Sequence, residues 1–278
     1  MINRRFLLGI LLTVYLCGCS ANNGVNDPYE QGLTYDPSQT ALIPAGPFVM
    51  GSDSWADTER PAHTVHLNAY RIDKYEVTND QYAFYLRLIE NLEDAEGNEL
   101  VDIGDTDLEI GFTDNGLVVL DSTKANHPII EVSWYGAKAY CEFIGGRLPT
   151  EAEWEKAARG ETGQHFPWSN DPLESSLLID WSLQGYGAVG VRAVDLSPYG
   201  VHDMGGNVAE WVHDWYASEY YKTSPDQNPT GPETGDRRVA RGGATSPYPQ
   251  DMRATVRRRY RPDTTGRSIG FRCVYDVE

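Results

Sequence analysis

Three stretches of the chain carry the hydrophobic periodicity and end signals of short amphipathic helices. The first and third open with the spacing of a capping box, in which Thr78 precedes Gln81 and Thr150 precedes Glu153 by three residues. The second begins at Ser133 and stops at a pair of glycines, a common helix terminator. The pattern predicts helices in VTNDQYAFYLRLI (77–89), VSWYGAKAYCEFIGG (132–146) and RLPTEAEWEKAARG (147–160).

A long acidic segment separates the first two predicted helices. Residues 90–128 carry eleven Asp or Glu and a single Lys. The triplet Asp114-Asn115-Gly116 predicts a small hairpin, because Asn-Gly favours the tight turn that joins two antiparallel strands. A charge run of this kind is typical of a solvated excursion, which we favour over a dedicated cation site.

The first nineteen residues have the pattern of an export signal. Arg4 and Arg5 precede an apolar stretch, residues 6–16, that is shorter than the roughly 20 apolar residues of a spanning helix. The run Leu16-Cys17-Gly18-Cys19 resembles a bacterial lipobox, in which Cys19 becomes the lipidated first residue; an ordinary signal peptide cut nearby is the alternative. We expect a lipoprotein signal peptide (1–18), a flexible tether (19–40) and one domain (41–278).

Composition and charge narrow the class of protein. The formal net charge is −18, although residues 237–278 hold ten Arg against four acidic residues. This balance argues against nucleic acid as a partner. Aromatic residues make up 11% of the chain and long periodic helices are few, which predicts an α+β domain with much irregular backbone.

Only two cysteines follow Cys19, namely Cys141 and Cys273. An exported compartment is oxidising, so a disulfide is favoured, with two unconnected buried thiols as the alternative. A metal site would need further Cys or His at close spacing, and the sequence has none.

Seven motifs follow one another in an order that resembles the formylglycine-generating enzyme family, also called the sulfatase-modifying-factor domain, from about Leu42 to Val274. The resemblance implies an α+β formylglycine-generating-enzyme fold with a C-type-lectin-like core, stabilised by bound calcium. It also implies a disulfide between Cys141 and Cys273. The motifs are IPAGPFVMGSD (43–53), ERPAHTVHLNAYRIDKYEVTNDQYAFYL (59–86), HPIIEVSWYGAKAYCEFIGGRLPTEAEWEKAARG (127–160), FPWSND (166–171), YGVHDMGGNVAEWVHDWY (199–216), RVARGG (238–243) and IGFRC (269–273).

The loop DMGGNVAEW, residues 203–211, matches a calcium site of the family. Calcium prefers about six to eight hard oxygen ligands, which carboxylates and backbone carbonyls supply. The resemblance implies that the ligands come from Asp203, Gly206, Val208 and Glu210. Of the family's second calcium site, Asp180 is the one candidate ligand that can be traced.

The resemblance also implies a chemistry whose ligands this sequence lacks. Family members that make formylglycine oxidise a cysteine of a sulfatase peptide with dioxygen, using copper held by two cysteines a few residues beyond the RGG motif. Here residues 244–256 read ATSPYPQDMRATV, without a cysteine, and Ala244 stands where the oxidase pattern commonly has Ser. The single thioether of Met252 cannot replace two thiolates as a ligand set for Cu(I). We therefore expect no copper site.

Three arginines, Arg241, Arg257 and Arg272, occupy places where the family also shows Arg. We expect them to pair with carboxylates rather than to form an anion-binding floor, because buried arginines need such partners. The candidate partners are the pair Tyr75-Glu76 together with Glu151 and Glu153.

Two classes of function remain open. The first is a binding or scaffold module, a lipoprotein anchored to a membrane through Cys19 that holds a peptide, protein or glycan of the cell envelope. Ser20 favours the outer membrane. The second is a family enzyme, either one with a different oxidative reaction, such as siderophore or sulfur-compound maturation, or a formylglycine-generating oxidase. We favour the binding module, whose expected ligand cleft is formed by Ala244, Pro247, Tyr248, Met252 and Arg253.

Overall fold

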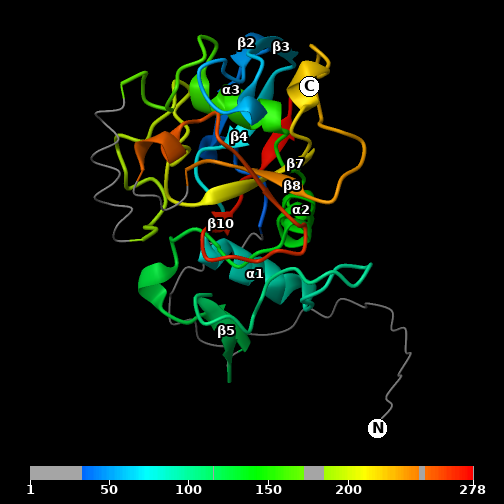
Figure 1. The fold of residues 1–278 in the computed structure, drawn as a ribbon. Helices are drawn as coiled ribbons and strands as arrows, with labels where there is room; N and C mark the ends of the chain where they lie inside the picture. The colour runs from blue at the N-terminus through cyan, green and yellow to red at the C-terminus, as the bar shows by residue number, and fades with distance from the viewer. Residues whose placement is uncertain (1–32, 115, 172–184, 244–247, 278) are drawn as a thin grey trace. The chain divides into compact units, whose positions relative to one another are not determined.

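The computed structural model describes residues 33–114, 116–171, 185–243 and 248–277 (Figure 1). These belong to one compact unit, Leu33–Glu278. The predicted signal peptide, Cys19 and most of the predicted tether lie outside the described residues. Within the unit, Leu33 and Tyr35 pack against the core, and the ring of Tyr35 lies 4.3 Å from that of Tyr275. Among the described residues, no helix has the length and apolarity needed to span a bilayer.

All three predicted helices are confirmed. They are α1 (Asn79–Ile89), α2 (Trp134–Phe143) and α3 (Glu151–Arg159). The capping boxes of α1 and α3 form as the spacing predicts, with Thr78 and Thr150 as N-caps. Ser133 caps α2 and accepts a hydrogen bond from the backbone N–H of Gly136.

The strands of the described residues form four small sheets rather than one continuous layer. Their orders are β1-β4-β11, β10-β7-β8-β9, β2-β3 and β5-β6. Short strands joined by long irregular connections agree with the predicted α+β class. The strands are β1 (Thr40–Ile43), β2 (Gly46–Met50), β3 (His63–Leu67), β4 (Tyr70–Asp73), β5 (Ile110–Thr113), β6 (Gly116–Val119), β7 (Ala209–Trp215), β8 (Arg238–Arg241), β9 (Arg257–Tyr260), β10 (Ile269–Gly270) and β11 (Val274–Asp276).

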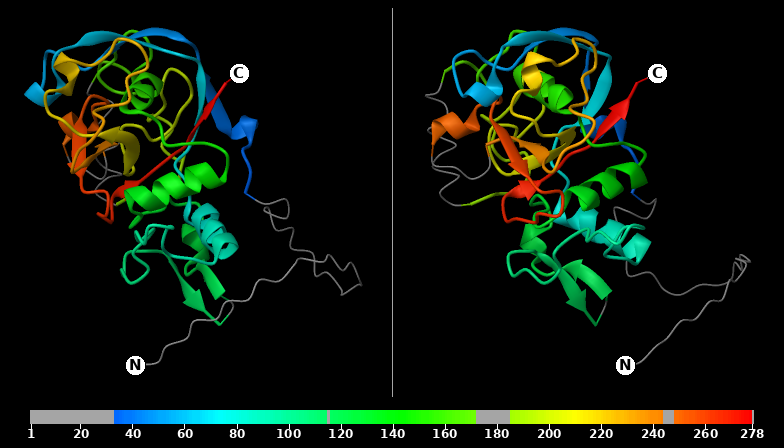
Figure 2. Two further views of the ribbon diagram at one scale, coloured as in Figure 1. Left: turned by 90° about the vertical axis from the view of Figure 1, so that its right-hand side faces the viewer. Right: turned by 45° about the vertical axis from the view of Figure 1, so that its right-hand side comes forward.

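The predicted hairpin in the acidic segment is confirmed as β5 and β6, which pair antiparallel from Ile110↔Val119 to Thr113↔Gly116. Figures 1 and 2 show it beside α1, on the side of α1 away from β7 and β8. The guanidinium of Arg87 in α1 donates to the carbonyl oxygen of Leu117 at 3.2 Å, which ties the hairpin to the helix.

The core consists of two large buried clusters. One gathers Tyr82, Tyr140 and Phe271 around α1 and α2, and the other surrounds Trp154 of α3. A disulfide joins Cys141 of α2 to Cys273, with a Cα–Cα distance of 5.5 Å, so the expected bridge is confirmed. It lies inside the first cluster, where both cysteines are fully buried.

Candidate functional site

Two glycine-rich loops, one after β8 and one before β7, lie in direct backbone contact. Gly242 has a φ of +93°, which favours glycine. A Cβ atom on Gly243 would lie 2.0 Å from the carbonyl oxygen of Gly205, and a Cβ on Gly205 would lie 2.5 Å from the ring of Trp168. A side chain on Gly243 would therefore force the two loops apart, and one on Gly205 would displace the ring of Trp168.

The arginine of the RGG motif is bound by carboxylates, as expected. Arg241 is fully buried and donates to Glu151 at 3.1 Å and to Glu155 at 2.6 Å. Arg257 on the next strand binds Glu151 through two hydrogen bonds, of 2.7 and 2.9 Å. The sequence indicated Glu151 as a partner but gave no indication of Glu155, which lies one helical turn later on α3.

The other two expected carboxylate partners are wrong. Glu153 pairs with Arg147, outside the set of three arginines, at 2.7 Å. Arg272 binds Glu210, not Glu76, through two hydrogen bonds of 2.7 Å each. Glu76 accepts instead from the side-chain amide of Asn207 at 2.6 Å.

Six buried charged residues surround the DMGGNVAEW loop. Four are carboxylates and two are guanidinium groups, so the group carries two negative charges in excess. Burying unpaired charge is costly, and either protons or a divalent cation must neutralise the excess. The six are Glu76, Asp195, Asp203, Glu210, Arg192 and Arg272.

Three carboxylates of this group, those of Glu76, Asp195 and Asp203, have raised pKa values. Burial raises the pKa of Asp195 to about 7, and the neighbouring charge of Asp203 adds to the effect. Burial likewise raises the pKa of Glu76, with Asp203 and Glu210 as the next causes, and it raises that of Asp203. Close like charges in a dry interior therefore favour uptake of a cation or a proton.

One oxygen of Asp203 has no hydrogen bond among the described residues. Its Oδ2 accepts from the backbone N–H of Gly190 at 2.5 Å, but Oδ1 is buried without such a partner and lies 3.8 Å from the guanidinium of Arg192. Asp203 also has a φ of +61°, which is uncommon for a residue with a side chain. A buried carboxylate oxygen that accepts no hydrogen bond, on a glycine-rich loop, is a suitable donor for a hard cation.

Glu210 retains part of its coordinating capacity. Its Oε2 accepts from Arg272 at 2.7 Å and from the indole N–H of Trp154 at 2.9 Å, whereas Oε1 accepts only the 2.7 Å bond from Arg272. Carboxylate oxygens of this kind are ligands that calcium prefers. Asp203, Gly206, Val208 and Glu210 would hold the ion, and its charge would neutralise the excess. Calcium at this centre remains a prediction.

Chelation of calcium is expected to lower the melting temperature. A cation that binds only the folded state, at a hundredfold excess over its Kd, stabilises by about 2.7 kcal/mol. For a domain of this size that is roughly 5–10 °C. The measurement is thermal melting with added calcium and with a calcium chelator.

The matched variants for this test are Asp203→Ala and Glu233→Gln. Asp203→Ala removes the carboxylate whose Oδ1 accepts no hydrogen bond from the described residues. The melting temperature of this variant should no longer respond to chelator. Glu233→Gln changes an exposed acid outside the centre and should keep the wild-type response. A wild-type melt that chelator leaves unmoved would show that the loop is only a turn.

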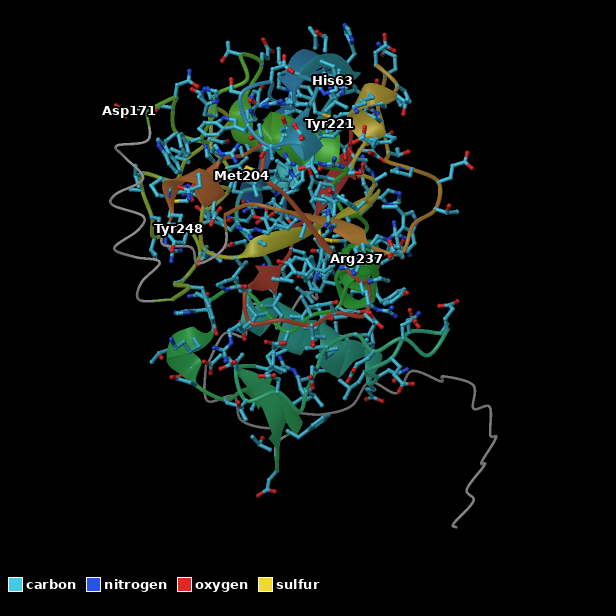
Figure 3. All side chains as sticks on the ribbon, viewed as in Figure 1. His63, Asp171, Met204, Tyr221, Arg237 and Tyr248 are labelled. Carbon is cyan, nitrogen blue, oxygen red and sulfur yellow. A yellow bond between two sulfur atoms is a disulfide. The ribbon has the colours of Figure 1, made fainter. Side chains whose placement is uncertain are left out.

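The residues of the expected ligand cleft have different surroundings. Ala244 and Pro247 lie outside the described residues. Tyr248 is 58% exposed and lies on the surface in Figure 3. Met252 is fully buried and packs with Phe166, so it is not open to a ligand.

Arg253 also differs from the expected cleft residue, because it is buried and paired. Its guanidinium donates to the two carboxylate oxygens of Glu59 at 2.7 and 3.1 Å and lies 4.2 Å from the ring centre of Trp55. Removal of one partner from such a buried pair is costly, so the pairing of Arg253 with Glu59 stabilises the fold around them. Of the three described cleft residues, Tyr248 alone presents most of its side chain to solvent.

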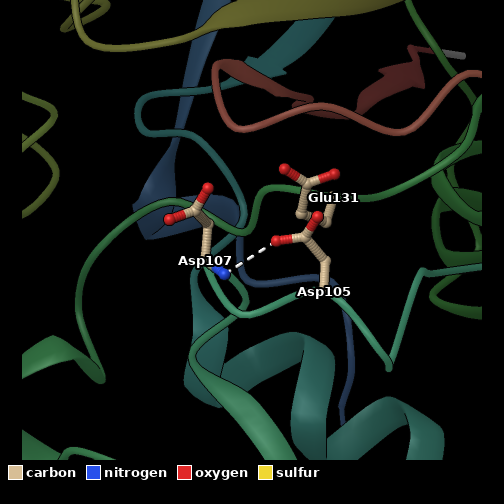
Figure 4. Close-up of side chains that lie close together, drawn as sticks. All are labelled: Asp105, Asp107 and Glu131. Atoms are coloured by element: carbon tan, nitrogen blue, oxygen red, sulfur yellow. Dashed lines mark hydrogen bonds between the residues drawn. The ribbon is translucent and has the colours of Figure 1, made fainter.

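A second group of acids lies apart from this centre. Figure 4 shows Asp105 and Asp107 beside Glu131, and one carboxylate oxygen from each lies within 4.8 Å of the others. Burial raises the pKa of Glu131 to about 7, followed by the effect of Asp105, and Arg267 pairs with Asp107 at 2.5 Å. Protonation of Glu131 and the ion pair between Arg267 and Asp107 both reduce the repulsion among the three acids.

The fold and the order of the motifs define a protein of the formylglycine-generating-enzyme type. The chain belongs to the family described as the sulfatase-modifying factor enzyme 1-like domain, whose model matches residues 26–277. The expected fold, with its C-type-lectin-like core, is thereby confirmed.

The relatives of the chain include a formylglycine-generating enzyme. That protein, from Streptomyces coelicolor, is 32% identical over 295 residues, which cover 90% of this chain and 94% of the enzyme. The serine/threonine-protein kinase pkn1 of Chlamydia pneumoniae is 35% identical over 242 residues, or 86% of this chain; the match spans only 38% of the kinase. The structure of PvdO from Pseudomonas aeruginosa superposes with a TM-score of 0.65 at 23% identity, covering 86% of this chain and 94% of PvdO, which shows a shared fold.

Proposed function

We propose that this protein is an exported, lipid-anchored member of the family that binds a peptide, protein or glycan of the cell envelope and does not oxidise cysteine. One observation carries the proposal. Beyond Cys19 the chain has only Cys141 and Cys273, and these two are joined in a buried disulfide. No thiolate pair is left to hold Cu(I).

The remaining groups near the RGG motif do not replace those thiolates. The thioether of Met252 is buried against Phe166, and a single thioether is a weak ligand. The guanidinium groups of Arg241, Arg257 and Arg272 are all paired with carboxylates, which argues against an anion-binding site near the RGG motif. The donor set therefore does not fit copper.

Exposed aromatic side chains support a binding role for this edge of the domain. Trp55, which covers the guanidinium of Arg253, is 39% exposed, and Tyr248 caps the short helix that leads to Arg253. Trp and Tyr commonly anchor interfaces, because they supply a large contact area together with a polar group.

The anchor and the location form the second part of the proposal. The lipobox-like run that ends at Cys19 supports lipidation of this residue. One saturated chain gives only marginal membrane binding, so a stable anchor needs the multiple acyl chains of a lipoprotein. We propose a position in the cell envelope facing the periplasm or the exterior, with the outer membrane favoured by Ser20.

The test is an assay for formylglycine. We expect no conversion when the purified protein is incubated with copper, a reductant and a peptide that contains the Cys-x-Pro-x-Arg motif, because Cu(I) finds no thiolate ligands. Mass spectrometry of the peptide measures the result, and the Streptomyces coelicolor enzyme serves as the positive control. Conversion clearly above a sample with metal alone would contradict the proposal and point to an unrecognised ligand set.

A further inference from the structure

A second surface, far in sequence from the RGG motif, has the character of a docking site. It is a groove of about 780 Å³ between the C-terminal part of α1 and the β5–β6 hairpin, within the usual range of about 300–1,000 Å³ for ligand sites. We call it the hairpin groove. Its apolar lining consists of Leu86, Leu92, Phe112 and Leu117, and its rim includes Arg87, Glu90 and Glu93.

The apolar lining is well supported from below and open above. Leu86 of α1 and Leu117 of β6 are buried and form the floor. Phe112 of β5 is 66% exposed, more than any other large hydrophobic residue in the described part of the chain. Phe112 extends the apolar lining of the groove, and an apolar patch with a polar rim is the kind of surface that binds partners.

The rim of the groove carries two acids against one arginine, and the segment that forms the hairpin is acidic. Glu90 and Glu93 lie on its rim, and residues 90–128, which follow α1 and include the hairpin, carry eleven acids and one Lys. The one cation of the lining, Arg87, lies 5.2 Å from the ring centre of Phe84 and donates to the carbonyl oxygen of Leu117. The field over the groove is therefore negative and attracts basic groups.

We propose that the hairpin groove docks a short segment of a partner protein in which an aromatic or aliphatic anchor is flanked by Lys and Arg. The anchor would pack against Phe112 over Leu86 and Leu117, and the basic flanks would face Glu90 and Glu93. The tether of this chain is a poor occupant, because residues 20–32 contain two acids and neither Lys nor Arg. This inference does not depend on the function proposed for the RGG edge.

The test uses a fluorescein-labelled peptide with a Trp-Leu pair between two pairs of Lys and Arg, and fluorescence anisotropy as the readout. Two control peptides replace Trp-Leu by Ser-Ser or the basic residues by Glu. We expect saturable binding of the first peptide alone. Its affinity should fall as salt approaches about 1 M, where the Debye length is about 3 Å.

Two pairs of variants locate the site. Phe112→Ser should raise the Kd about tenfold, as expected for loss of a central aromatic contact, and Glu93→Lys should raise it several-fold. Leu42→Ser removes another exposed apolar residue, on β1, whose exposure is 50%, and Glu233→Lys reverses an exposed acid outside the groove. Both variants should bind as wild type does. Thermal melts check that all four variants fold.

Three results would overturn the proposal. The first is that Phe112→Ser and Leu42→Ser weaken binding to the same extent, or that neither of them weakens it. Another is binding of the Ser-Ser peptide as tight as that of the Trp-Leu peptide, which would leave no role for the apolar lining. The third is a dimer of the protein alone that Phe112→Ser dissociates in sedimentation, because the occupant would then be a second copy of the chain.

Discussion

Removal of the Cys141–Cys273 disulfide is expected to lower the melting temperature by about 10–20 °C. The bridge spans 132 residues, and a loop of this length restricts the unfolded chain by an amount worth about 5 kcal/mol in the chain-entropy model. A domain of this size loses roughly 2–4 °C for each kcal/mol. Both cysteines are fully buried in the cluster around α1 and α2, so their loss also affects packing.

The double variant Cys141→Ala/Cys273→Ala is the appropriate form of this test, since a single substitution would leave a reactive thiol. Wild-type protein unfolded and refolded in reductant should approach the melting temperature of the double variant, and reductant should not change the double variant itself. Calorimetry or circular dichroism measures both. If the double variant has the same melting temperature as the oxidised wild type, the bridge contributes nothing to stability.

Local signals in the sequence were sufficient to predict the helices and the hairpin. The capping boxes at Thr78 and Thr150 depend on residues three positions apart, so the sequence contains all of the interacting groups. The Asn-Gly pair that predicts the hairpin is equally local in the sequence. The absence of cysteine from residues 244–256, on which the proposal about copper rests, is also visible in the sequence.

The surroundings of the site residues depend on partners that are distant in the chain. Arg253 seemed available for a ligand, but Glu59, 194 residues earlier, occupies its guanidinium. Glu210 pairs with Arg272, 62 residues later. No periodicity or spacing in one sequence reports such pairs, which is why the acidic excess of the candidate calcium centre became visible only in the fold.

Replacement of Arg241 by methionine is expected to lower the free energy of unfolding by about 3–5 kcal/mol, the usual cost of removing one partner from a buried ion pair. Arg241 donates to the carboxylates of Glu151 and Glu155 and to the carbonyl oxygens of Ala254 and Thr255. Methionine fills part of the volume but leaves these four acceptors with fewer donors. Urea denaturation followed by tryptophan fluorescence measures the loss.

The pH dependence of this loss separates the charge from the packing. Burial alone would raise the pKa of Glu155, but Arg241 and Arg159 together lower it below its usual 4.5. In Arg241→Met the loss of that guanidinium should raise the pKa of Glu155 above its usual 4.5. Glu155 then favours folding only where it is protonated, and this contribution to stability is lost as pH rises through the new pKa. The deficit relative to wild type should therefore be larger at about pH 7 than at about pH 5.

The control for Arg241→Met is Arg259→Met, an exposed arginine of the neighbouring strand β9 whose guanidinium donates to the hydroxyl of Tyr216. A surface substitution of this kind should change stability by no more than about 0.5 kcal/mol, without the same pH dependence. Arg241→Lys should fall between the two, because it keeps the charge and loses the two-armed geometry that reaches both glutamates. If Arg241→Met is as stable as Arg259→Met, the buried pairing contributes no net stability, and the arginine of the RGG motif would need another explanation.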